Sequence, residues 1–280
     1  MKNEVELLST AIKAAVRGGK EILEVYSQEF EVQFKEDQSP LTLADRKAHS
    51  SISHILNITD LPVLSEEGQH LPFEVRKEWK QYWLVDPLDG TKEFVKRNGE
   101  FTVNIALIVE HKAEIGVIFV PVTGVLYFAA NTTGACKTIV TNLEDYNIDD
   151  LIENAIPLPS QQLPDKVTVV CSRSHMSPET MEFIEQLKQE GKEPDYVSVG
   201  SSLKLCLVAE GKAHIYPRFG PTMEWDTAAG QAIVEKSGGS VIKTDKSGPV
   251  EYNNKAGLLN PWFIAYFSTS TSSTSNTSVE

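Results

Sequence analysis

Hydrophobic positions in the first 65 residues predict two helices and two short strands. Leu8, Ile12 and Ala15 recur at helical spacing within residues 3–27, although the pair Gly18–Gly19 weakens that helix unless it serves close packing. The segments that follow are expected to be a strand at 30–34, a loop at 36–41, a helix from 42 to about 56 and a buried strand at 61–65.

Strand-forming runs dominate the middle of the chain. The run YWLV ends at Asp86, and FTVNIALIVE, EIGVIFVP and GVLYFAA follow it, separated by turn signals at 111–113 and 121–124. Such closely spaced runs predict an antiparallel meander. Residues 141–165 are acidic and rich in Pro, Gln and Asn, so the boundary between two halves is placed there.

Strands and helices alternate in the second half, which is an α/β pattern. Strands are expected at 167–172, 195–199, 213–217, 240–244 and 262–267, and helices at 177–190, 201–210 and 226–236. We therefore predict an α+β half over 1–160, an α/β half over 161–267 and a disordered Ser/Thr-rich tail over 268–280. The active site is expected between the two halves.

Composition and charge narrow the possible partners. The chain has 280 residues, 41% of them hydrophobic, and no apolar run approaches a membrane span. Its N-terminus is amphipathic and acidic, unlike a signal or transit peptide. Three scattered cysteines without metal-ligand spacing are interpreted as reduced, mostly buried thiols in a cytoplasm. The net charge of −13 argues against long nucleic acid but does not exclude a small phosphorylated substrate.

The most informative segment is DPLDGT at 86–91. It presents Asp86, Asp89 and Thr91 within six residues, while Pro87 and Gly90 shape the backbone between them. Carboxylate and hydroxyl oxygens suit hard divalent cations, and two ions about 3.5–4 Å apart suit displacement at phosphorus. The simpler alternative is a turn between strand and helix whose aspartates only cap the next element.

Three other segments add acidic residues in a suggestive order. Thr42 and Asp45 form a capping-box pattern, Glu66 and Glu67 follow an apolar strand, and Asp226 starts a helix as a common N-cap. Capping or a surface turn explains each one separately. Their joint occurrence with DPLDGT in one chain favours a magnesium-dependent phosphatase instead.

This order of motifs resembles the inositol monophosphatase superfamily of magnesium-dependent, lithium-sensitive phosphatases. The pair DPLDGT and WDTAAG is specific to it, and the resemblance extends to about residue 267. The runs DPLDGTKEFVKRNGEFTVNIALI, SRSH, GSSLK, LVAEG and YPRFGPT resemble the bacterial 3′(2′),5′-bisphosphate nucleotidases of the CysQ type. The implied fold is a layered αβαβα sandwich of the inositol monophosphatase and fructose-1,6-bisphosphatase type.

The resemblance implies roles at the metal site. Glu66, Asp86 and the carbonyl of Leu88 would hold one Mg²⁺, and Asp86, Asp89 and Asp226 a second. Asp45 and Glu67 would orient metal-bound waters or help to hold a third ion. Thr91, held by Asp45, would share a hydrogen bond with the water that attacks phosphorus.

The resemblance also implies substrate contacts. Ser201, Lys204 and Arg218 would contact the second phosphate and the ribose, and His175 would line the nucleoside pocket. Ser202 belongs to the same helix start, where free backbone amides favour phosphate. Gly90, Thr91 and Asp226 complete the implied substrate contacts.

The implied reaction is hydrolysis of adenosine 3′,5′-bisphosphate to AMP and phosphate, with 3′-phosphoadenylyl sulfate as a second candidate substrate. Two alternatives remain: an inositol or sugar phosphate phosphatase, and a non-catalytic, metal-dependent nucleotide sensor. A cytoplasmic monomer or homodimer is expected, and the resemblance allows peripheral association with the inner face of the cell membrane.

Overall fold

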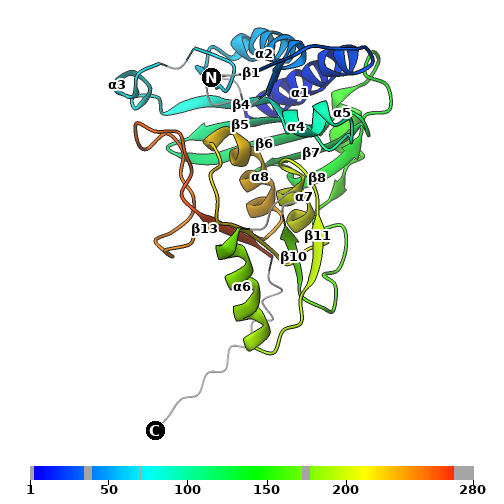
Figure 1. The fold of residues 1–280 in the computed structure, drawn as a ribbon. Coiled ribbons are helices and arrows are strands. Elements are labelled where there is room, and N and C mark those ends of the chain that lie inside the picture. Colours follow the sequence, from blue (N-terminus) through cyan, green and yellow to red (C-terminus); the bar gives the residue numbers. More distant parts are fainter. Residues whose placement is uncertain (1–2, 35–39, 70, 172–176, 268–280) are drawn as a thin grey trace.

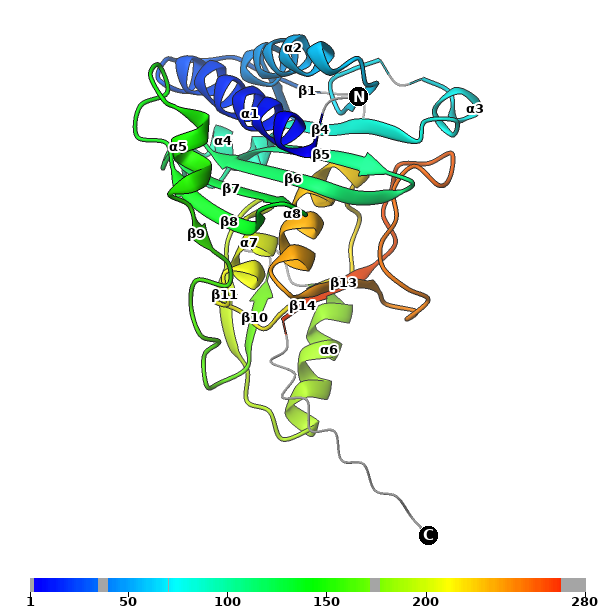
Figure 2. The same ribbon diagram turned by 180° about the vertical axis from the view of Figure 1, so that it is seen from behind.

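A computed structural model describes residues 3–34, 40–69, 71–171 and 177–267 of the chain. Within these ranges, helices and sheets alternate in five layers (Figures 1 and 2). Helices α1 and α2 lie at the top of Figure 1, followed by the larger sheet, helices α7 and α8, the smaller sheet and helix α6. The predicted αβαβα sandwich is confirmed.

Most helices lie where the sequence predicts them. The helical bounds are α1 Glu4–Tyr26, α2 Leu43–Leu56, the 3₁₀ turn Asn57–Thr59, α3 Phe73–Arg76, α4 Thr91–Val95, α5 Ile148–Glu153, α6 Pro178–Gln189, α7 Leu203–Ala209 and α8 Glu224–Lys236. Helices α3 and α5 were not predicted, and α5 is the longer of the two. It lies in the polar segment 141–165 and begins at Asn147, whose side chain accepts hydrogen bonds from the backbone of Asp149 and Asp150.

The larger sheet, as far as the chain is described, has seven strands in the order β3-β4-β5-β6-β7-β8-β9. Their bounds are β3 Val63–Ser65, β4 Gln81–Asp89, β5 Thr102–Val109, β6 Lys112–Val120, β7 Val125–Ala130, β8 Gly134–Ile139 and β9 Ile156–Pro157. The pairs from β4 to β9 are antiparallel, and β3 runs parallel to β4. Strands β5 to β7 confirm the predicted meander, whereas β8 and β9 were not predicted.

The smaller sheet comes from the second half of the chain. Over the described residues it has five strands in the order β11-β10-β12-β14-β13. Their bounds are β10 Thr168–Cys171, β11 Asp195–Ser198, β12 Ile215–Arg218, β13 Ser240–Lys243 and β14 Phe263–Tyr266. A separate hairpin joins β1 Val32–Phe34 to β2 Pro40–Thr42, so the loop expected at 36–41 is wrong for its last two residues.

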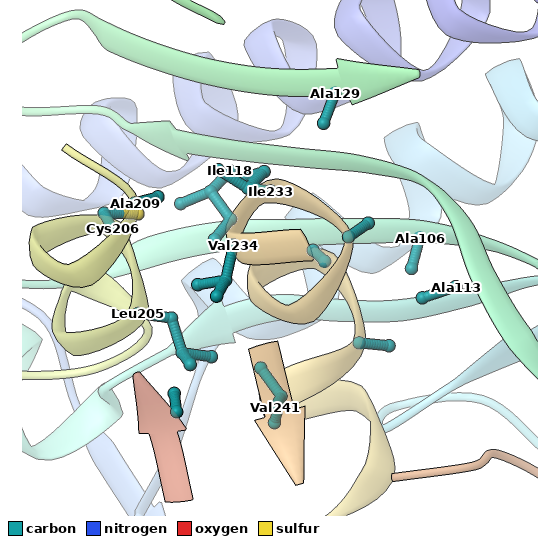
Figure 3. Close-up of a cluster of buried hydrophobic side chains, with 14 of the residues drawn as sticks. Ala106, Ala113, Ile118, Ala129, Leu205, Cys206, Ala209, Ile233, Val234 and Val241 are labelled. Carbon is teal, nitrogen blue, oxygen red and sulfur yellow. The ribbon is translucent and has the colours of Figure 1, made fainter. Parts of the chain in front are cut away.

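Alternating side chains of each strand fill the spaces between layers. Trp83 and Val85 of β4 pack toward α1 and α2, whereas Tyr82 and Leu84 pack toward α7 and α8. The hydrophobic cluster that contains Tyr82 and Leu84 forms the middle of the molecule, and it includes residues of β6, α7, α8 and β13 (Figure 3). Val169 of β10 faces the opposite side and packs against α6.

The glycine pair in α1 serves close packing. A Cβ atom added to Gly18 would lie 2.6 Å from the Ile52 side chain, and one added to Gly19 would lie 2.4 Å from Phe119. Both positions therefore need glycine so that α1 can approach α2 and the sheet. The cost in helix propensity is offset by this burial.

The predicted division near residue 160 coincides with the end of the larger sheet, because β9 is its last strand. Helix α8 of the second half nevertheless packs against β6, so the two halves share one core. The division remains an organisational prediction. Cys136, Cys171 and Cys206 are free and buried, and no helix in the described ranges is long and apolar enough to cross a membrane.

Candidate active site

A bulge in β4 brings Asp86 and Asp89 to the same face of the sheet. Asp86 is paired with Asn104 and Asp89 with Thr102, so three steps along β4 match two along β5. In a regular strand, residues three apart point to opposite faces; the extra residue of the bulge restores the alignment. The backbone that Pro87 was expected to shape is thus an irregularity within β4, and both carboxylates face the layer of α7 and α8.

Asp45 is both a helix cap and a partner of Thr91. Its Oδ2 accepts hydrogen bonds from the Thr42 amide and hydroxyl, each at 2.7 Å, which completes the predicted capping box. Its Oδ1 accepts a hydrogen bond from Thr91 Oγ1 at 3.1 Å. Asp45 therefore caps α2 and holds the Thr91 hydroxyl at the same time.

Glu66 and Glu67 extend the acidic cluster from the neighbouring strand. Glu66 directly follows β3, and its amide donates to the Val85 carbonyl at 3.1 Å, which places it next to Asp86. Glu67 lies within electrostatic range of Asp45 and of His49 on α2. Because parallel strands end at the same edge, Glu66 and Asp86 converge there.

Asp226 enters the cluster from the first turn of α8. The helix begins at Glu224, with Met223 as N-cap, so the prediction that Asp226 is the N-cap is wrong. Asp226 is the third helical residue, and its Oδ2 accepts a hydrogen bond from the Met223 amide at 2.9 Å. This bond holds the carboxylate at the helix end that faces the larger sheet.

These carboxylates raise one another's pKa. Burial, followed by the charges of Glu66, Asp89 and Asp226, raises the pKa of Asp86 well above its ordinary value. Burial and the charge of Asp89 raise the pKa of Asp226 to about 8. Among the described residues, no three His, Cys, Asp or Glu side chains form a compact metal-binding group. The oxygen-only donor set nevertheless fits Mg²⁺, whose charge would relieve this repulsion.

The start of α7 differs from its prediction. The Gly200 amide donates to Glu100 at 2.8 Å, and the Ser202 amide donates to Asp89 Oδ2 at 2.6 Å. These two amides are therefore engaged by the protein's own carboxylates and are not free for phosphate. The buried Ser202 hydroxyl bonds to Thr102 and Asn104, each at 2.8 Å, so Ser202 holds the segment in place.

Gly90 and Ser201 meet where the two halves come together. Gly90 has φ = +89°, and an added Cβ would lie 3.1 Å from the Ser201 side chain. Ser201 itself has φ = 44°. Non-glycine residues with positive φ are uncommon and concentrate at functional sites, so the strain at Ser201 accords with its expected substrate contact.

A basic pair lies next to the acidic cluster. A cavity of about 80 Å³ is lined by Asp89, Ser201, Lys204, Arg218 and Asp226, among other residues. Lys204 is buried and donates to the Ser201 carbonyl at 2.7 Å, and burial lowers its pKa although the charge of Asp89 opposes this. Within the described ranges, the buried Nε of Arg218 has no hydrogen-bond partner, which suits an anionic ligand.

Not every predicted site residue can be placed, and several neighbours were missed. His175 lies outside the described residues. Asn104, Glu100 and His49 were not predicted, although Asn104 interrupts the apolar run FTVNIALI and a buried polar residue there was a usable signal. Glu100 and His49 left no comparable pattern in the sequence.

The fold and these motifs define a class of phosphatase. The model of the inositol monophosphatase family matches residues 3–272, and the chain belongs to this family. Phosphatases of this family are metal-dependent and generally use Mg²⁺. The crystal structure of the extragenic suppressor protein SuhB from Bartonella henselae, 22% identical with a TM-score of 0.70 over 93% of each chain, shares the fold.

Relatives within the family specify the branch. The 3′(2′),5′-bisphosphate nucleotidase CysQ of Shigella flexneri is 45% identical over 92% of this chain and 98% of its own length. CysQ of Escherichia coli K12 is 44% identical with the same coverage. The crystal structure of CysQ from Bacteroides thetaiotaomicron is 50% identical, with a TM-score of 0.83, over 92% of this chain and 95% of that one. The resemblance inferred from the motifs is thereby confirmed.

Proposed function

We propose that this chain is a Mg²⁺-dependent 3′(2′),5′-bisphosphate nucleotidase that hydrolyses adenosine 3′,5′-bisphosphate to AMP and phosphate. The observation that carries this proposal is the placement of Lys204 and Arg218 in one cavity with Asp89 and Asp226. A metal-binding acidic cluster and a separate basic pair suit a substrate with two phosphates. The CysQ relatives, similar over almost their whole length, support the same activity.

The ions would be held by groups from four segments. Glu66, Asp86 and the Leu88 carbonyl would hold one Mg²⁺, and Asp86, Asp89 and Asp226 a second, with Asp45 and Glu67 near a third, weaker position. Bound there, Mg²⁺ would neutralise phosphate oxygens and make a coordinated water more acidic. Each ligand set contains only oxygen atoms, as Mg²⁺ prefers.

Thr91 and Asp45 would act on the attacking water. The Thr91 hydroxyl has one proton and two acceptors within reach, Asp45 Oδ1 at 3.1 Å and the Leu88 carbonyl at 3.2 Å. A cation on the Leu88 carbonyl would leave Asp45 as the acceptor. The Thr91 oxygen could then accept a hydrogen bond from the water, and Asp45, whose pKa burial raises, could take the proton through this relay.

Lys204 and Arg218 would bind the second phosphate. Both are basic, both line the cavity, and Arg218 is anchored by a hydrogen bond from Nη2 to the Pro221 carbonyl at 2.7 Å. Ser201 would add a hydroxyl at the same place. Adenosine 3′,5′-bisphosphate satisfies this pair, as does 3′-phosphoadenylyl sulfate, which links the enzyme to sulfur metabolism.

Two alternative functions would use the same metal site. One is an inositol or sugar phosphate phosphatase, and the other is a nucleotide sensor that does not turn over its ligand. An inositol or sugar monophosphate would leave the basic pair unpaired. A non-catalytic sensor should have lost a ligand or the relay, whereas the hydrogen bond between Thr91 and Asp45 is intact. A cytoplasmic location, peripheral membrane association and a monomeric or homodimeric state remain predictions.

Phosphate release tests the proposal directly. Adenosine 3′,5′-bisphosphate, inositol 1-phosphate and fructose 1,6-bisphosphate are compared at equal concentration with Mg²⁺, with Mg²⁺ plus Li⁺ and with excess chelator. We expect the nucleotide to be preferred, lithium to inhibit, and chelator to abolish turnover until Mg²⁺ is restored. Preference for inositol 1-phosphate or for fructose 1,6-bisphosphate would favour the first alternative, and undiminished turnover in chelator would exclude the metal mechanism.

A further inference from the structure

A closed polar network lies beneath Asp89. Thr102, Asn104 and Ser202 are all buried, in a position where β5 faces the start of α7. Asn104 Oδ1 accepts hydrogen bonds from the hydroxyls of Thr102 at 3.0 Å and Ser202 at 2.8 Å. Asn104 Nδ2 donates to Asp89 Oδ2 at 3.3 Å. One amide side chain thus connects two hydroxyls to a carboxylate.

The orientation of the Asn104 amide follows from its partners. An ionised carboxylate only accepts hydrogen bonds, so the nitrogen of Asn104 must face Asp89. The oxygen then faces the two hydroxyls, at least one of which donates to it; their own oxygens lie 2.8 Å apart, so two protons serve the three contacts. Reversing the amide would place an oxygen against the carboxylate, so the network permits a single arrangement.

Both hydrogen bonds that the described residues give to Asp89 end on one oxygen. Asp89 Oδ2 accepts from Asn104 Nδ2 and from the Ser202 amide at 2.6 Å. Two donors on Oδ2 fix the rotation of the carboxylate plane and concentrate its remaining acceptor capacity on Oδ1. A carboxylate oriented in this way is prepared to bind an ion through one oxygen, without a rearrangement on binding.

We propose that Asn104 is a positioning residue that orients Asp89 for binding Mg²⁺ through Oδ1. This inference rests on the proposed function. Because Ser202 shares the network, the same contacts link the ligand Asp89 on β4 to the start of α7, where Ser201 and Lys204 face the cavity. Asn104 itself touches neither the ion nor the substrate.

Calorimetric titration with Mg²⁺ alone, in the full-length protein, tests the role without relying on turnover. Asn104→Ala should weaken Mg²⁺ binding about 10–100-fold, the range for loss of a partner that orients a metal ligand. Thr59→Val is the matched control, because it removes a buried hydroxyl, bonded to Trp83 Nε1 at 2.9 Å and to the Leu56 carbonyl at 2.7 Å, that is no part of this network. Its Mg²⁺ affinity should stay within about threefold of the wild-type value even if its melting temperature falls equally.

A second variant, Ser202→Ala, tests the inference if Asn104→Ala does not fold. Ser202→Ala keeps the backbone amide that binds Asp89 but removes the hydroxyl that holds Asn104, so an intermediate loss of Mg²⁺ affinity is expected. If Asn104→Ala is folded and binds Mg²⁺ with wild-type affinity, the inference is overturned and the proposed function is left intact. If Asn104→Ala does not melt cooperatively, wild-type affinity in Ser202→Ala has the same meaning. A wild-type protein that does not bind Mg²⁺ overturns both.

Discussion

Gly116 on β6 lies directly against the backbone of Ala229 on α8: a Cβ atom added to Gly116 would be 2.3 Å from the Ala229 carbonyl oxygen. This contact seats α8, the helix that carries Asp226, on the larger sheet. Gly230 of the same helix is packed as closely, since its added Cβ would lie 2.3 Å from the Leu205 side chain. The small residues of the WDTAAG motif thus set the depth of the helix between the two sheets.

Gly116→Ala should therefore destabilise the protein. Displacement of α8 or of the strand should lower the free energy of unfolding by about 1–3 kcal/mol, the usual cost of overpacking a core. Urea denaturation measures it. Gly257→Ala, where nothing lies within 4 Å and φ is not positive, is the matched control and should change stability little. Equal stability of Gly116→Ala and wild type would mean that the layers adjust freely.

Thr91→Ala should lower kcat far more than it changes KM. The hydroxyl is proposed to act on the attacking water, an interaction made mainly in the transition state, and such groups contribute about 10²–10⁴-fold. Steady-state phosphate release on adenosine 3′,5′-bisphosphate measures both constants. Thr91→Ser keeps the hydroxyl and should retain much of the activity. A raised KM with unchanged kcat would make Thr91 a binding residue.

Arg218→Ala should change the choice of substrate. Loss of a charge-assisted hydrogen bond, about 1.5–3 kcal/mol, should raise KM for adenosine 3′,5′-bisphosphate at least tenfold. Slow hydrolysis of a simple monophosphate should hardly change, because that substrate never used the second phosphate site. Parallel assays of the two substrates decide the matter. Equal losses on both would show that Arg218 supports the metal site or the loop through Pro221.

Glu210→Gln should alter the pH dependence of stability. Glu210 ends α7, and its buried carboxylate accepts hydrogen bonds from Tyr127, from Lys137 at 2.9 Å and from Lys212 at 2.7 Å. Burial alone would raise the pKa of Glu210, but the hydrogen bonds from Lys212, Tyr127 and Lys137 outweigh it and hold the pKa below its ordinary value.

The sign follows from this lowered pKa. Glu210 stabilises the fold above the ordinary carboxyl pKa, and the contribution is lost as the pH falls through the lower folded value. Thermal melts from neutral to acidic pH should show Glu210→Gln less stable than wild type at pH 7, with a gap that closes in acid. Glu185→Gln, which removes an exposed ion pair with Lys188, should change little at any pH. A constant gap across the range would exclude titration of Glu210 as its cause.

Local patterns predicted most of the fold because the periodicity of buried positions is strong in this chain. The meander and α8 follow from it, and so does α1 despite Gly18 and Gly19. Helix α5 was missed although Ile148, Leu151 and Ile152 recur at helical spacing and pack against the core, because the acidic composition of 141–165 was interpreted as a boundary; β9 was missed because its two residues are exposed. The pairing of Pro40–Thr42 with β1 was missed because a three-residue strand next to a proline has the pattern of a loop.

The acidic residues of the site were predictable because each belongs to a compact motif. Their hydrogen bonds were not, because these depend on contacts between distant segments. The sequence predicted that the Ser202 amide is free to bind phosphate, yet this amide donates a hydrogen bond to Asp89 on β4. Asp226 appeared to be an N-cap, yet its acceptor geometry belongs to the third helical position. Motifs indicate which groups converge, and tertiary packing decides which oxygen or amide remains available.

The bulge between Asp86 and Asp89 also means that the DPLDGT motif depends on the number of residues between its two aspartates. With one residue fewer between them, the two aspartates would lie two apart in a regular strand and would still share a face, but the bulge would be lost, and with it the Leu88 amide that donates to Asp86 Oδ1 at 3.0 Å. Substituting Pro87 would leave that count unchanged. In homologous sequences, the two-residue spacing should therefore tolerate changes of residue type and reject deletions.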